Sequence, residues 1–266
     1  MRSKLYIAVA ALFAVSCSPI VTDSELVNSF DKDNIQLSAY QATAGSNEIT
    51  LKLESTGITG YWDYIINTKY TDEVTVVFPY TGTHTFTFYS TTPYINNGDL
   101  SDLEYVSESI EVEVTQLDVA LDDAYYNLVG NDLGGKTWVF NGTAGDGNVW
   151  WAMVDGGNYA SVLWNATNDY VTPTDVDGKM YFDVAGGANY DYYSSADAEP
   201  VRGSFVFNST FTTLTFPSEV NILGSSNDLS CGATTYEIIE LTEDSLILFA
   251  SAVDNGTGWI WAFCPE

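Results

Sequence analysis

The sequence predicts an all-β protein made of two successive β-sandwich domains. Segments such as NEITLKLE, THTFTFYS and SIEVEVTQ alternate apolar and polar residues, which is the pattern of strands with one face in a core. Thr, Val, Tyr and Phe dominate these segments and turn residues recur at short spacing, whereas no long window shows a helical period. Together these observations are typical of an all-β sandwich.

The N-terminal residues predict export. Arg2 and Lys4 precede an apolar run from Leu5 to Val15, and small residues follow. This order is typical of a signal peptide, and the run is too short to span a bilayer as a lasting helix.

The end of this leader, Ala-Val-Ser-Cys at positions 14–17, resembles the bacterial lipoprotein cleavage box. The resemblance implies that residues 1–16 are removed and that Cys17 carries acyl chains, each buried CH2 of which contributes about 0.8 kcal/mol to membrane anchoring. Residues 17–30 are then a lipidated tether, and Ser18 in place of Asp implies the outer membrane. Plain secretion with an incidental Cys17 is the alternative.

The charge balance restricts the partners. The chain has 36 acidic and 8 basic residues, for a net charge of −28. Such a surface repels nucleic-acid phosphates and anionic lipid head groups. It suits neutral partners, cations or a saline environment, and solubility alone is the alternative reading.

Residues 31–116 are predicted to form the first sandwich. Trp62-Asp63 and the later segment FPYTGTHTFTF resemble a PKD-type immunoglobulin-like domain. The glycine-rich turn expected after the tryptophan is missing, so the resemblance is to a divergent member. Trp62 is expected in the core, and His84 is expected on the polar face of a strand.

Residues 117–266 are predicted to form the second domain, a jelly-roll-like sandwich, which begins with the separating segment LDVALDDAYYNLVGND. About eight short strands are expected, among them KTWVFNG, NVWWAMV, ASVLWNA, KMYFDVA and GWIWAFCPE. The strands TYEIIEL and SLILFA, joined by TED, predict a hairpin.

The whole layout resembles the surface glycan-binding lipoproteins of Bacteroidota, which are SusE/SusF-like accessories of SusC/SusD-type importers. The resemblance rests on the lipoprotein cysteine, the PKD-like domain, GGKTWVF, the WW strand, LTEDSLIL and GWIWAF. It implies an N-terminal spacer and a distal sandwich that binds a polysaccharide or oligosaccharide without cleaving it. The implied partners are that ligand, the importer complex and the outer membrane through the lipid anchor, with no nucleic acid.

Candidate sugar-binding residues are aromatic groups flanked by polar ones, because a large ring supplies apolar area with little rotamer entropy to lose. Trp150 and Trp151 are adjacent, so in a strand one of them points into the core and the other outward. The outward one is predicted to stack on a sugar ring, with an exposed position or a domain contact as the alternative.

Two further groups are candidates for the same platform, and each has a plainer alternative. Trp164 ends an apolar run, which equally fits core packing, and the tyrosine run NYDYYSS equally fits a plain surface loop. Trp259, Trp261 and Phe263 alternate on one face and are expected in the core, as are Trp138 and Phe140, the alternative being an open concave face. The predicted glycan-binding residues are Trp150, Trp151, Trp164, Tyr190, Tyr192, Tyr193, Asn165 and Asp155.

The other cysteines predict a disulfide rather than a metal site. Cys231 and Cys264 are the thiols left in the mature chain of an exported protein, and we expect them to pair. The only histidine is His84 and no CxxC occurs, which argues against a zinc site or a Cys/His nucleophile. No cofactor is expected. A structural calcium ion is the alternative, held either by Asp175 and Asp177 in TDVDGK or by Asp99, Asp102 and Glu104 in NNGDLSDLE.

Catalysis is not expected. The E-x-D-x-x-E strand of jelly-roll glucanases is absent, because EIIELTED lacks its alternation. Two alternatives to a glycan-binding protein stay open. One is a glycoside hydrolase or lyase of the β-sandwich type, which needs two carboxylates at a defined separation. The other is a structural or adhesive envelope protein without a glycan site.

Overall fold

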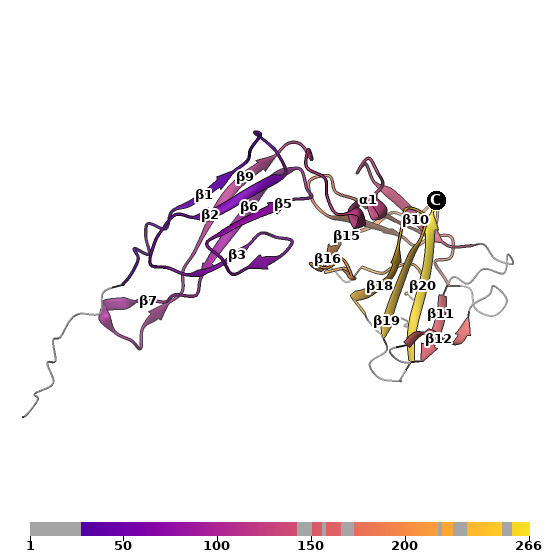
Figure 1. The fold of residues 1–266 in the computed structure, drawn as a ribbon. Helices are drawn as coiled ribbons and strands as arrows, with labels where there is room; N and C mark the ends of the chain where they lie inside the picture. Colours follow the sequence, from indigo (N-terminus) through magenta and orange to yellow (C-terminus); the bar gives the residue numbers. More distant parts are fainter. Residues whose placement is uncertain are drawn as a thin grey trace, which may run out of the picture.

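The structure is a computed structural model, and it describes the chain in seven stretches. These are residues 28–142, 151–155, 158–165, 173–217, 220–225, 233–251 and 257–266, with only the backbone at 159–165 and 257. The all-β prediction is confirmed, because the described residues form twenty strands, one short 3-10 helix and one α-helix. They form two lobes side by side (Figure 1).

The N-terminal domain consists of two antiparallel sheets and a small hairpin. The first sheet has the order β1 (Leu37–Tyr40), β2 (Glu48–Leu53), β5 (Glu73–Val77). The second has the order β4 (Thr68–Lys69), β3 (Gly60–Asp63), β6 (Gly82–Ser90), β9 (Ser107–Val114). The hairpin contains β7 (Tyr94–Ile95), the 3-10 helix η1 (Asn96–Gly98) and β8 (Leu103–Glu104).

The core of this domain follows the alternation of its strands. Every second residue is buried along β2, and along β6 from Phe86 to Ser90, which confirms the two-residue period expected of a sandwich. The buried residues on the two sheets include Ile49, Leu51, Leu53, Trp62, Phe86, Phe88, Val112 and Val114.

Trp62 is a core residue, as expected, but His84 is not on a polar face. The Trp62 indole N–H donates to the Asp72 carbonyl at 3.3 Å, and the ring meets Phe88 edge-on at 5.5 Å between centroids. His84 shares its side of β6 with Phe88 and is half-buried, with its ring centroid 4.6 Å from that of Phe78. Strand parity assigns His84 to the apolar face, and the expectation of a polar face was wrong.

A short helix, α1 (Asp123–Val129), follows the N-terminal domain, in the segment that is expected from the sequence only to separate the two domains. The Asp122 carboxylate accepts a hydrogen bond from the first turn, and Gly130 follows the last turn with a φ of 94°. The Trp138 indole N–H donates to the Leu128 carbonyl at 2.9 Å, which attaches the helix to the C-terminal domain. A helix of seven residues is too short to show a clear period in sequence.

The C-terminal domain is built on one nearly closed antiparallel sheet of eleven strands rather than on two separate sheets. Nine strands follow one another in the order β15 (Val201–Ser204), β14 (Asn189–Tyr193), β13 (Lys179–Asp183), β10 (Lys136–Phe140), β20 (Thr257–Pro265), β19 (Leu246–Ser251), β18 (Thr235–Leu241), β17 (Thr213–Thr215), β16 (Val206–Phe207). The other two strands are β11 (Trp151–Asp155), which pairs with β20, and β12 (Asn158–Asn165), which pairs with β11.

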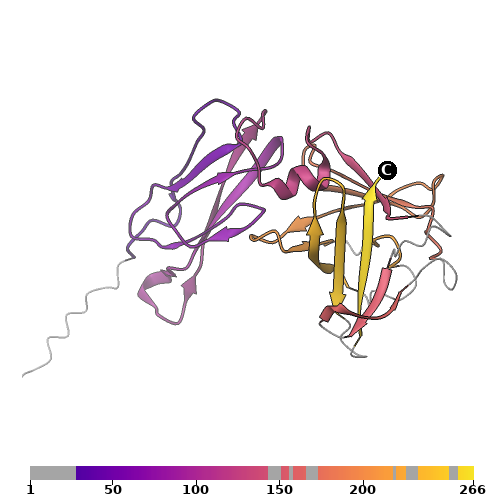
Figure 2. The same ribbon diagram turned by 45° about the vertical axis from the view of Figure 1, so that its right-hand side comes forward.

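The long strand β20 holds this sheet together. One of its edges pairs with β19 along most of its length, and the other pairs first with β11 and then with β10. The predicted hairpin between β18 and β19 is confirmed, because Leu241 pairs with Leu246 and the Thr242 N–H donates to the Ser245 carbonyl at 2.8 Å. Figure 2 shows these C-terminal strands side by side, with α1 lying between the lobes.

The two domains contact each other beside α1. Tyr80 of the N-terminal domain and Tyr125 of α1 lie close enough to affect each other's ionisation, and burial raises the pKa of both phenols. A cavity of about 260 Å³ has Ile66 and His84 of the N-terminal domain on one wall and Phe205 of the C-terminal domain on the other. Packed side chains therefore join the domains in addition to the connecting chain.

Candidate functional site

Trp151 is the inward member of the adjacent tryptophan pair. Its side chain is 2 % exposed, its Cα lies opposite that of Trp261, and its ring stacks on Trp259 with centroids 5.2 Å apart at 27°. Trp151 is therefore a core residue and presents no open ring to a sugar. Trp150 lies outside the described residues, so the expected outward, sugar-binding tryptophan stays a prediction.

The aromatic interior of the C-terminal sheet reaches the surface at one end of β11 and β20. Trp261 and Phe263 are fully buried, as expected, whereas Trp259, two residues earlier on the same face, is only partly buried. Two residue pairs further along the ladder of β11 and β20, Asp155 lies opposite Asn158 of β12, and both side chains are exposed. A partly buried indole beside an exposed carboxylate and amide is suited to a sugar ring and its hydroxyls.

We call this region the tryptophan end, and define it by Trp151, Met153, Asp155, Asn158 and Trp259. Strand β12 runs beside this region, and its pairing with β11 shows which of its residues lie there. The Cα atom of Trp164 lies opposite that of Met153, and that of Asn165 opposite that of Ala152. The side chains of Trp164 and Asn165 are not among those that the structure describes. Register nevertheless brings Trp164, Asp155 and Trp259 to the same part of the ladder formed by the three neighbouring strands β12, β11 and β20.

The tyrosine run does not belong to this region. Tyr190 is fully buried and Tyr192 is 5 % exposed, and burial raises the pKa of both phenols. The expectation of a polar surface run is wrong for these two residues, because they alternate with Asp191 along β14 and point into the core. Tyr193 points outward and is half-buried, with the Lys179 ammonium 5.4 Å from its ring centroid. Strands β13 and β10 separate β14 from β20.

Asp175 is a structural group rather than a free carboxylate. Its side chain is 1 % exposed, accepts a hydrogen bond from the Tyr192 hydroxyl at 2.7 Å, and accepts the Gly224 N–H at 3.0 Å. Asp177, two residues later in the same turn, is exposed. Within the described stretches, no group of three or more His, Cys, Asp or Glu side chains is arranged to hold a metal ion.

The cysteines add no reactive site to the described part of the chain. Cys264 is half-buried, with its Sγ 3.7 Å from the Phe140 carbonyl oxygen, and burial raises the pKa of its thiol. Cys231 and Cys17 lie outside the described residues. The disulfide and the lipid anchor therefore stay predictions.

Sequence reasoning missed one group of aromatic residues, on the N-terminal domain. Tyr61 of β3 lies between Tyr70, the residue after β4, and Tyr89 of β6, with its ring centroid 5.0 Å from that of Tyr70 and 5.3 Å from that of Tyr89. We call these three residues the tyrosine row. Strand parity could have assigned Tyr61 and Tyr89 to the outer face, since each adjoins a buried residue, Trp62 and Phe88, but it could not have shown that they meet.

Comparison with known proteins assigns no family. No protein-family model matches the chain, and no curated protein is similar to it. In the stretches that the structure describes, none of the helices has the length and apolar character needed to cross a bilayer.

Proposed function

We propose that this protein is a lipid-anchored protein of the outer membrane whose C-terminal domain binds a polysaccharide without cleaving it and helps to deliver it to a glycan importer. The observation that carries the proposal is the tryptophan end, where an aromatic core opens to solvent. The half-buried Trp259 lies there on the same ladder as the exposed Asp155, two residue pairs away, and Asp155 is paired with the exposed Asn158. Aromatic area framed by a few polar groups is the usual composition of a small-ligand site.

The place where the described chain begins supports attachment of the protein to the membrane through its N-terminal end. The Asn28 side chain exchanges hydrogen bonds with the backbone of Ile95, donating to its carbonyl at 2.9 Å and accepting its N–H at 2.6 Å. These contacts fix the start of the described chain at β7, at the end of the molecule away from the C-terminal domain (Figure 1). A tether from Cys17 would then hold the tryptophan end away from the membrane.

The charge of the chain supports a neutral ligand. A net charge of −28 disfavours nucleic acid and anionic lipid as partners of this surface. A polysaccharide without acidic groups carries no such electrostatic cost, and its CH faces match an indole ring.

Retention in native gels loaded with soluble neutral polysaccharides tests the binding. The panel comprises an α-glucan, a β-glucan, a xylan, a mannan and a galactan. We expect one of them to retard the wild-type protein, and we expect Trp259→Ala to lose most of the retardation because it removes the accessible indole. Trp150→Ala tests the outward tryptophan in the same gels.

Tyr193→Ala is the matched control, because it removes a half-buried aromatic ring from the same domain on a strand three places from β20. It should be retarded like the wild type, and thermal melts should show that each variant is folded. A wild-type protein that migrates freely in every gel contradicts the proposal. New reducing ends released from the retarding polysaccharide would show an enzyme instead.

Lipidation is tested separately. Cys17→Ala removes the acceptor thiol of the lipoprotein box, so we expect an unprocessed precursor that takes up no labelled palmitate. Cys264→Ala is the control and should be labelled like the wild type. Equal palmitate incorporation into Cys17→Ala would refute the anchor.

A further inference from the structure

We propose that the tyrosine row is a second contact surface for the polysaccharide, so that the N-terminal domain binds ligand rather than serving only as a spacer. The choice of ligand class rests on the proposed function, but the surface is separate from the tryptophan end. It lies on the outer face of the sheet β4-β3-β6-β9.

Strand register builds the row. The Cα atoms of Tyr61 and Tyr89 are paired across β3 and β6, and their rings are stacked at 19° with centroids 5.3 Å apart. Tyr70, the residue after β4, extends the row on the other side of Tyr61 at 5.0 Å and 44°. The two outer rings keep 74 % and 38 % of their surface in solvent, at Tyr70 and Tyr89.

The row has no packing role in the core. Trp62 and Phe88, the neighbours of Tyr61 and Tyr89, are fully buried and fill the interior on the opposite face of the same strands. The three tyrosines contact one another instead, and a contiguous exposed aromatic patch of this kind marks an interaction surface. Because the rings already support each other, little side-chain freedom is left to lose when a ligand binds.

Hydroxyl groups frame the rings. In the next row of the same face, Asp63 lies opposite Thr87, and Thr87 lies opposite Ser109. The Thr87 and Ser109 hydroxyls are 3.0 Å apart, and Ser107, opposite Tyr89, is exposed. These groups can donate and accept hydrogen bonds, as a polyhydroxylated ligand requires.

The charges on this face select among partners. Glu111 and Glu113 of β9 are exposed on the side that carries Ser107 and Ser109. An anionic lipid surface or a nucleic acid would be repelled by them, and so would a second copy of a chain with a net charge of −28. A neutral polysaccharide fits both the aromatic rings and the hydroxyl groups without that repulsion.

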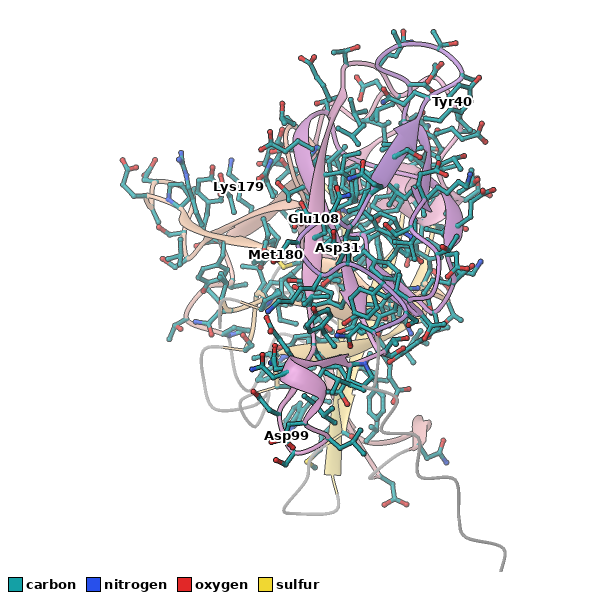
Figure 3. All side chains as sticks on the ribbon, turned by 90° about the vertical axis from the view of Figure 1, so that its left-hand side faces the viewer. Asp31, Tyr40, Asp99, Glu108, Lys179 and Met180 are labelled. Atoms are coloured by element: carbon teal, nitrogen blue, oxygen red, sulfur yellow. The ribbon has the colours of Figure 1, made fainter. Side chains whose placement is uncertain are left out.

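The test uses the full-length mature chain and the polysaccharide of the panel that retards the wild type. We expect Tyr70→Ala and Tyr89→Ala each to raise the dissociation constant by about fivefold or more, measured by calorimetry. Tyr40→Ala is the matched control, because Tyr40 is 66 % exposed but lies on β1 in the other sheet, at the upper edge of the domain in Figure 3. It should bind like the wild type.

A second measurement needs no substitution. Tetranitromethane nitrates exposed tyrosines, and peptide mass spectrometry reports the modified positions. Saturating polysaccharide should protect Tyr70 and Tyr89 by severalfold and leave Tyr40 unprotected.

The results of these measurements distinguish the proposal for the tyrosine row from the proposal for the tryptophan end. If the tyrosine variants bind like the wild type while Trp259→Ala does not, the row is not a site and the proposed function stands. If the tyrosine variants lose affinity while Trp259→Ala does not, the row stands and the tryptophan end fails. Absence of binding by the wild type to the whole panel overturns both.

Discussion

Replacing Trp151 by alanine is expected to lower the free energy of unfolding by about 3–5 kcal/mol, the usual cost of deleting a buried tryptophan ring. Trp151 is 2 % exposed and stacks on Trp259, so its removal leaves a cavity between β11 and β20. Urea denaturation followed by tryptophan fluorescence measures the effect. This signal reports mainly on the C-terminal domain, because Trp62 is the only tryptophan before residue 117.

Asp155→Ala is the control for this substitution. Asp155 ends the same strand but is exposed, so its replacement should change the free energy of unfolding by no more than about 0.5 kcal/mol. A Trp151→Ala variant as stable as Asp155→Ala would show that the ring is not part of the core.

Replacing Asp175 by alanine is expected to lower the free energy of unfolding by about 2–6 kcal/mol, because it leaves two buried donors without an acceptor at about 1–3 kcal/mol each. These donors are the Tyr192 hydroxyl and the Gly224 N–H. Asp175→Asn keeps one acceptor oxygen and should lose less. The same urea titration measures both variants.

Asp177→Ala is the matched control, since Asp177 lies in the same turn but is exposed. It should stay within about 0.5 kcal/mol of the wild type. Equal losses from Asp175→Ala and Asp177→Ala would mean that the turn depends on its net charge rather than on the buried hydrogen bonds. A chelator should leave the stability of the wild type unchanged if the carboxylate of Asp175 serves only these protein donors.

Several features of the fold were predictable because they depend on neighbouring residues. Alternation along NEITLKLE and THTFTFYS assigned strands and their buried faces, and the TED turn assigned the hairpin between β18 and β19. The helix α1 was missed because a segment of two turns is too short for a period to emerge. His84 was assigned to the wrong face, although the parity of Phe86 and Phe88 already indicated the apolar one.

The candidate sites depended more on long-range pairing. Tyr190 and Tyr192 look polar in sequence because Asp and Ser surround them, yet β14 lies inside a sheet whose curvature buries one of its faces. The tyrosine row shows the converse, since Tyr61, Tyr70 and Tyr89 are scattered over 29 positions and meet only through strand register. Neither arrangement is visible in a window of neighbouring residues.

The sequence by itself determined the all-β class, the alternation of most strands and the acidic surface. It also determined that two adjacent tryptophans cannot share a face of a strand. These features follow from composition and from the two-residue period of β-strands. Only the tertiary structure decided that Trp151 is inside, that Trp259 lies where the core opens, and that three tyrosines form one row. The physical reason is that burial depends on which strands pair and how far a sheet closes, and those contacts join residues far apart in the chain.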